Sequence, residues 1–169
     1  VWTAGHCVYD NEYHTWHSNW VFVPAYRNGA APYGVWSQYD AAVLTAYSAG
    51  TNNSIAYDYA TVIINDRNGR SIGSTVGYLG FLANATRVLH WMDFGYPQAA
   101  PFAGQYLHLN AASHARDDGN FSPNPIGIGS DLTGGSSGGP WIYRFDQYAG
   151  AYNYVNGVNS YKYINPNQP

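Results

Sequence analysis

Short stretches of apolar, β-branched or aromatic residues recur along the chain, and clusters of glycine, proline, asparagine and serine separate them. This pattern is typical of β-strands joined by turns. It predicts strands at residues 20–23, 42–46, 60–64, 86–94, 105–110, 141–144 and 154–161. Residues 39–47 are also compatible with a short helix, but no long stretch repeats with the helical period of about 3.6 residues. Many short strands with few helices predict an all-β sandwich or barrel.

The composition narrows the classes of function. Only 10% of the residues are charged and the net charge is −3, so the chain lacks the basic stripe of a nucleic-acid-binding protein. No apolar run reaches the roughly 18 to 20 residues that span a bilayer, which predicts no membrane insertion. Aromatic residues make up 17% of the chain. With so little charge, this composition favours a secreted, extracellular enzyme or a glycan-binding surface.

A length of 169 residues suits a single domain, and neither a repeat nor a linker divides it. The chain begins at Val1, in a stretch that resembles a strand, and ends at residues 165–169 without a closing element. We therefore expect a fragment or a processed piece. Cys7 is the only cysteine, so no disulfide can form within the chain, and any partner of Cys7 would lie upstream of Val1.

Three segments carry candidate chemistry, and the first contains His6. Small residues surround this histidine in the sequence Thr-Ala-Gly-His-Cys at residues 3–7, which allows a strand end to turn sharply and project the imidazole at a rim. An imidazole titrates near neutral pH and therefore suits a general base. The chain has six histidines, and a loop histidine without a catalytic role is the alternative interpretation.

The second segment contains Asp58, which lies between Tyr57 and Tyr59 and directly precedes the apolar residues 60–64. A carboxylate in this place should be largely shielded from water, which is costly unless a partner donates a hydrogen bond to it. A histidine N–H would supply that bond, and an aspartate that caps a turn is the alternative. Other aspartates enter no comparable apolar run: Asp40, Asp66 and Asp93.

The third segment, residues 133–141, contains Ser136 and Ser137 in the sequence Gly-Gly-Ser-Ser-Gly-Gly-Pro. Glycines on both sides of a serine permit a tight turn whose backbone N–H groups face one point, and such a turn can stabilise an oxyanion. A flexible linker is the alternative. Against it, the strand predicted at residues 141–144 follows directly, and Pro140 stiffens the approach to that strand.

Together, the three segments resemble those of the chymotrypsin-like serine peptidases, in the family's order and over essentially the whole chain. Residues 3–7 resemble the motif Thr-Ala-Ala-His-Cys, and residues 135–140 resemble Gly-Asp-Ser-Gly-Gly-Pro. Phe-Gly-Tyr-Pro at residues 94–97 and Gly-Val-Asn-Ser at residues 157–160 also resemble strand ends of the family's second barrel. The similarity points to the bacterial branch that includes the glutamyl endopeptidases.

This resemblance implies an all-β fold of two Greek-key β-barrels with the active site between them. The chain would be a fragment that lacks the opening strands of the first barrel and the C-terminal end of the second. Residues 1 to about 66 would form the remainder of the first barrel, and residues 67–169 the second. The implied function is a serine endopeptidase that acts on protein or peptide substrates and needs no metal or organic cofactor.

The resemblance also implies residue roles. Ser137 would attack the scissile carbonyl, His6 would act as general base and acid, and Asp58 would orient His6. The backbone N–H groups of Gly135 and Ser137 would form the oxyanion hole. Ser160 matches the family serine that hydrogen-bonds the triad aspartate.

Substrate binding is expected from two places. Ser160, Tyr161 and Lys162 would pair with the substrate backbone by β-addition. Asp131 lies six residues before Ser137, at the spacing of a buried pocket-floor aspartate that selects lysine or arginine, and a surface residue is the alternative. The pocket residues leave the preference open. Asn159 stands where glutamyl endopeptidases carry a histidine, and Lys162 could favour acidic substrates or pair with Asp131.

Two further departures from the family concern the loop around the nucleophile. Ser136 replaces the aspartate of the family motif, which argues against an activating ion pair between that aspartate and a new N-terminus. No cysteine lies near Ser137, so loop rigidity would have to come from packing by Trp141 and nearby tyrosines.

The sequence leaves three other functions as alternatives. His14 and His17 could contribute to a zinc site, but no zinc-binding motif supports one. A catalytically inactive protease-like domain and an aromatic-rich carbohydrate-binding module are the remaining alternatives, because aromatic faces can stack on sugars.

Overall fold

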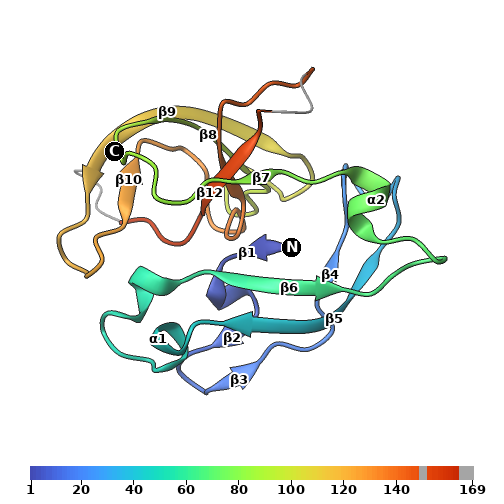
Figure 1. The fold of residues 1–169 in the computed structure, drawn as a ribbon, viewed down its shortest axis with the longest axis horizontal. Helices are drawn as coiled ribbons and strands as arrows, with labels where there is room; N and C mark the ends of the chain where they lie inside the picture. Colours follow the sequence, from blue (N-terminus) through green and yellow to red (C-terminus); the bar gives the residue numbers. More distant parts are fainter. Residues whose placement is uncertain (149–151, 164–169) are drawn as a thin grey trace.

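Two antiparallel strand systems dominate the computed structural model, which describes residues 1–148 and 152–163 (Figure 1). The first sheet has four strands in the order β1 (Trp2–Thr3), β6 (Ala60–Ile64), β5 (Trp36–Val43) and β4 (Val21–Phe22). A separate hairpin pairs β2 (Tyr9–Asp10) with β3 (Thr15–Trp16). In Figure 1, β1 lies on the side of this group that faces the second sheet.

The second sheet has six strands. Their order is β10 (Ile126–Ile128), β9 (His108–Asp117), β8 (His90–Gly95), β11 (Pro140–Tyr143), β12 (Tyr154–Val158) and β7 (Gly80–Phe81). Among the described residues of this sheet, the pairing of β12 with β7 is the one parallel pairing. The helical segments are short: η1 (Gly5–Cys7), α1 (Thr45–Ser48), η2 (Ser54–Tyr57) and α2 (Ile72–Val76). The all-β class expected from the sequence is therefore confirmed.

Each sheet buries one face. In the first group, alternate residues of β6 are buried and join a core of Val8, Tyr9, Tyr47, Ala60 and Val62. This alternation follows from the two-residue period of a strand. In the second sheet, β8 buries every second residue. That period carries an aspartate, Asp93, to the interior face with Trp91.

Element boundaries differ from the sequence predictions in several places. The strand predicted at 60–64 is confirmed as β6. The strand predicted at 42–46 and the helix considered at 39–47 are each correct only in part. Residues up to Val43 belong to β5, and α1 begins only at Thr45. The polar composition of β5 hides a strand that is held by its register with β6, where Ala42 faces Thr61. β9 extends to Asp117 because β8 and β10 pair with it.

Other predicted strands are shorter than expected. β8 begins at His90 rather than residue 86, and β12 ends at Val158 rather than residue 161. A strand was expected at the start of the chain, where β1 lies. Four other strands of two or three residues were not predicted, because segments this short show no extended apolar pattern: β2, β3, β7 and β10. Residues 165–169, for which no closing element was expected, lie outside the described residues. Within the described residues, no helix has the length and hydrophobicity needed to cross a membrane.

Candidate active site

His6 and Asp58 meet through two hydrogen bonds. His6 lies in η1, directly after β1, and Asp58 lies between η2 and β6. The Nδ1 atom of His6 lies 2.7 Å from Oδ2 of Asp58, and the backbone N–H of His6 donates to Oδ1 at 2.8 Å. Because β1 pairs with β6, the segments that follow β1 and precede β6 come together at one end of the sheet.

Asp58 has a further partner from the second sheet. The hydroxyl of Ser160, just beyond β12, donates to Oδ2 of Asp58 at 2.5 Å. The carboxylate is only 3% exposed, so these donors replace the water that burial removes. The shielded carboxylate expected from the sequence is present, and its histidine partner is His6.

These contacts shift both pKa values. Burial by itself would raise the pKa of Asp58, but the hydrogen bonds and charge of His6, with the hydroxyl of Ser160, lower it below its ordinary value. The hydrogen bond to Asp58 in turn raises the pKa of His6. An ionised carboxylate accepts but cannot donate, so Nδ1 carries the proton in the neutral imidazole and Nε2 is the free base.

The glycine-framed loop packs against the segment that carries His6. A Cβ atom on Gly138, whose φ is +78°, would overlap Oγ1 of Thr3 and lie 3.2 Å from the backbone N of Ala4. A Cβ on Gly139 would overlap the carbonyl oxygen of Phe94. Only glycine permits this approach, which sets the neighbouring Ser137 beside the strand end that precedes His6.

Hydrogen bonds on both sides hold this loop. The carbonyl of Gly134 accepts from the backbone N–H groups of Gln98 and Ala99, at 2.8 and 2.9 Å. On the other side, the N–H of Gly138 donates to the carbonyl of Asn159 at 2.8 Å. Trp141, expected to stiffen the loop by packing, contributes by donating from Nε1 to Oδ1 of Asn159 at 2.7 Å.

The two adjacent serines differ in their surroundings. Ser136 is 9% exposed, and its hydroxyl donates to the carbonyl of Thr133 at 2.8 Å. Ser137 is partly exposed, and its hydroxyl forms no hydrogen bond within residues 1–148 and 152–163, including none to His6. The hydroxyl of Ser136 is therefore used by the loop, whereas that of Ser137 is available.

The backbone N–H groups of Gly135 and Ser137 are among those of the loop that have no acceptor in the described part of the chain. Gly135 has a φ of +102°, and a Cβ there would lie 2.6 Å from Cβ of Gln98. This turn leaves one N–H donor on each side of Ser136 free for an external acceptor.

The candidate substrate-binding residues fall into two groups. Ser160 and Tyr161 make side-chain hydrogen bonds, to Asp58 and Asp118 respectively. Asp131 and Lys162 are both exposed, and no salt bridge joins them within the described residues. The pocket-floor interpretation of Asp131 required a buried carboxylate, so the exposure of Asp131 favours the alternative of a surface residue.

Asn159 joins the nucleophile loop to two strands, a role that the sequence analysis missed. Its Nδ2 donates to the carbonyls of Phe94 and Ser136, at 3.2 and 3.3 Å, in addition to the contacts of its backbone and Oδ1. Only its position directly before Ser160 pointed to it.

Asp93 is a second buried carboxylate, although it enters no apolar run comparable to the one after Asp58. It lies between Met92 and Phe94 in β8 and is 1% exposed. Oδ2 accepts from the hydroxyl of Ser130 at 3.2 Å, whereas Oδ1 has no hydrogen-bond partner in the described part of the chain. Burial raises the pKa of Asp93 to about 6, although Asn159 and Ser130 partly counteract the shift.

We expect Asp93→Asn to stabilise the protein above pH 6. The folded state holds this proton more tightly than the unfolded state, so the free energy of unfolding of the wild type falls as pH rises from about 4 to 6. The Asp93→Asn variant cannot ionise at this position, so its free energy of unfolding at pH 7.5 should exceed that of the wild type by about 3 kcal/mol. Urea unfolding at pH 4.5 and 7.5 measures this, with Asp66→Asn, a substitution at an exposed aspartate, as control. If the free energies of unfolding of the variant and the wild type differed by the same amount at pH 4.5 and pH 7.5, the prediction would be contradicted.

The candidate zinc residues His14 and His17 are not part of a larger ligand cluster. The Nδ1 atom of His14 lies 3.5 Å from the hydroxyl of Tyr9, and Nε2 of His17 lies 3.2 Å from the carbonyl of His6. The described residues contain no group of three or more side chains suited to hold a metal ion.

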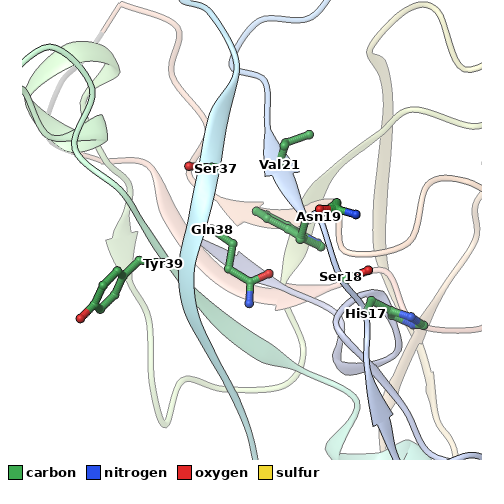
Figure 2. Close-up of a pocket in the computed structure, with 8 residues that line it drawn as sticks. His17, Ser18, Asn19, Val21, Ser37, Gln38 and Tyr39 are labelled. Carbon is green, nitrogen blue, oxygen red and sulfur yellow. The ribbon is translucent and has the colours of Figure 1, made fainter.

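A hollow of about 370 Å³ lies beside His17 (Figure 2). Figure 2 shows Tyr39 pointing away from Ser18 and Asn19, on the other side of its strand. The polar groups therefore do not converge on one point, as a specific binding site requires. The lining residues are His17, Ser18, Asn19, Trp20, Val21, Ser37, Gln38 and Tyr39.

The structure is similar to solved structures of proteases. The protease Anisep from Arthrobacter nicotinovorans is 40% identical, with a TM-score of 0.86 over 96% of this chain and 71% of that one. A thermostable serine protease, AL20, from an extremophilic microorganism is 32% identical, with a TM-score of 0.80 over 96% and 72%. A Glu endopeptidase in complex with MPD shares the fold at 21% identity, with a TM-score of 0.66 over 85% and 64%. No family model matches the sequence, and no curated protein does.

Proposed function

Because the chain belongs to the chymotrypsin-like serine proteases, near the glutamyl endopeptidases, we propose that it cleaves peptide bonds through His6, Asp58 and Ser137. The family makes the protein a serine-type endopeptidase. The observation that carries the residue assignment is the pair of hydrogen bonds that binds His6 to the buried Asp58, beside a loop whose only unbonded serine hydroxyl is that of Ser137.

The proposed first half-reaction transfers the acyl group to the enzyme. The hydroxyl oxygen of Ser137 attacks the scissile carbonyl carbon, and its proton passes to Nε2 of His6. The free N–H groups of Gly135 and Ser137 stabilise the oxyanion of the tetrahedral intermediate. His6 then donates its proton to the leaving amine as the C–N bond breaks, which leaves an ester on Ser137.

The second half-reaction hydrolyses this ester. Water attacks the acyl carbon while His6 accepts a proton from it, and the proton returns to the oxygen of Ser137 as the acid product leaves. Asp58 keeps Nδ1 protonated and stabilises the imidazolium at each step. The missing hydrogen bond between His6 and Ser137 is compatible with this role, since catalytic hydrogen bonds are often long before substrate binds.

The remaining assignments belong to the same proposal. The substrate main chain pairs with Ser160, Tyr161 and Lys162, whose backbone N–H and C=O groups make no hydrogen bond within the described residues. Residues 1–66 and 67–169 form the two barrels, with the site between them. The protein acts outside the cell on protein or peptide substrates.

A fluorophosphonate probe tests the proposed function. We expect covalent labelling of the protein, and digestion followed by mass spectrometry should locate the phosphonate on Ser137. Labelling at Ser136 would overturn the assignment of the nucleophile. An intact protein that never labels would overturn the proposed activity and favour an inactive protease-like domain.

A further inference from the structure

Tyr161 is tied to a buried carboxylate that lies outside the proposed catalytic residues. Its hydroxyl donates to Oδ2 of Asp118 at 2.7 Å, and the hydroxyl of Tyr163 donates to the same oxygen at 2.5 Å. Asp118 follows β9 and is 6% exposed. Two alternate side chains of the substrate-binding segment therefore end on one oxygen atom.

Asp118 is itself held in place by its own loop. Its backbone N–H donates to the carbonyl of Pro125 at 2.8 Å, and its Oδ1 accepts from the backbone N–H of Asn120 at 3.1 Å. Both oxygens of the carboxylate are thus engaged. A side chain with this many bonds is fixed well enough to position another residue.

The loop of residues 118–125 is also hydrogen-bonded to the connection between β5 and β6 of the first sheet. The side chain of Asn53 donates from Nδ2 to the carbonyl of Ser122 and accepts at Oδ1 from the N–H of Ser122, at 2.7 Å for the latter. Asn53 directly precedes η2, the turn that leads to Asp58. Asp118, the hydrogen-bond partner of Tyr161, therefore lies in a loop that is anchored next to η2, the turn that leads to Asp58.

The charges around Asp118 strengthen the hydrogen bond that it accepts from Tyr161. Burial would raise the pKa of Asp118, but the hydroxyls of Tyr163 and Tyr161 lower it below its ordinary value. Burial and the same contact raise the pKa of Tyr161, so its phenol remains a donor to an ionised acceptor. The guanidinium of Arg116, 5.0 Å from the ring centre of Tyr163, adds a cation beside the carboxylate. Hydrogen bonds to an ionised group are stronger than those between neutral groups.

We propose that Asp118 is a positioning residue that holds the substrate-binding segment in place through Tyr161, and this inference rests on the proposed function. Ser160 is bonded to Asp58 and Tyr161 to Asp118, so two consecutive side chains fasten the segment to two separate anchors. The backbone between these anchors is left free to pair with the substrate main chain. Losing the contact to Asp118 should weaken substrate binding while leaving the proton transfers unaffected.

The test compares Tyr161→Phe and Asp118→Asn with the control Asp117→Asn. Asp117 is the adjacent carboxylate, but it is exposed and binds Arg87 and His114 instead. Tyr161→Phe removes one oxygen atom and keeps the ring that packs edge-on against Phe121, so it remains informative if Asp118→Asn fails to fold. The substrates are an internally quenched peptide of about eight residues and p-nitrophenyl acetate, which is too small to reach the segment.

For the peptide, we expect KM to rise about tenfold in each variant, with kcat within about twofold of the wild type. Hydrolysis of p-nitrophenyl acetate should be unchanged in Asp118→Asn, and Asp117→Asn should match the wild type throughout. The double variant should be no worse than Asp118→Asn alone, because that substitution already weakens the bond that Tyr161→Phe removes. An unchanged KM, or additive effects in the double variant, would overturn the role of Asp118. A wild type that hydrolyses neither substrate would instead refute the proposed function.

Discussion

Replacement of Ser137 by alanine should lower kcat/KM for peptide hydrolysis by about 10⁵-fold or more. The substitution removes the oxygen that forms the acyl-enzyme and leaves the turn intact, because Ser137 uses no side-chain hydrogen bond to hold it. The backbone N–H groups at positions 135 and 137 would still face the carbonyl, so binding and oxyanion stabilisation should leave a small residual rate. Initial rates with a quenched peptide, with the enzyme at micromolar concentration, measure this.

Ser136→Ala is the matched control, since it removes a hydroxyl one residue away. Its loss breaks the bond to the carbonyl of Thr133, which should cost about 1 kcal/mol of stability. Activity should fall less than tenfold, and probe labelling should persist. The proposed nucleophile would be contradicted if Ser137→Ala kept more than about 1% of the wild-type rate. It would also be contradicted if Ser136→Ala lost as much activity as Ser137→Ala.

Replacement of Asp58 by asparagine should lower kcat by about 10⁴-fold with little change in KM. Asp58 accepts from Nδ1 of His6 and so keeps Nε2 unprotonated. An asparagine can turn its amide N–H₂ toward Nδ1, which favours the tautomer with the proton on Nε2. The base would then face Ser137 already protonated and could not accept its proton.

Steady-state kinetics of Asp58→Asn are best compared with those of Asp93→Asn. Asp93 is an equally buried carboxylate whose side chain bonds Ser130 and not a histidine. We expect Asp93→Asn to keep kcat within about tenfold of the wild type, which separates loss of a buried charge from loss of histidine orientation. A loss of less than 100-fold in Asp58→Asn would argue against its role in the triad.

The local sequence around the site was informative because each segment constrains its own backbone. The apolar run after Asp58 predicted β6 at its observed bounds, and the glycines around Ser137 predicted a tight turn. The same reasoning identified a shielded carboxylate in need of a histidine partner. Reasoning from the local sequence failed where a strand is formed by its pairing with a neighbouring strand and its own composition does not indicate one. β5 is polar on its exposed face, and its register with β6 decides its length.

The sequence by itself determined that the chain is an all-β protein and which short segments carry a histidine, an aspartate and a serine suited to hydrolysis. The resemblance also implied that Asp58 orients His6. Only the tertiary structure decided the atoms through which they meet and the contacts of the residues around them, because many of these contacts join residues far apart in the chain. It joined Nδ1 of His6 to Oδ2 of Asp58, used the hydroxyl of Ser136 in the loop, and buried Asp93 within a strand. It also brought Tyr161 to Asp118, 43 residues earlier in the chain. Sequence patterns record the preferences of neighbouring residues, whereas such contacts depend on how sheets and loops pack.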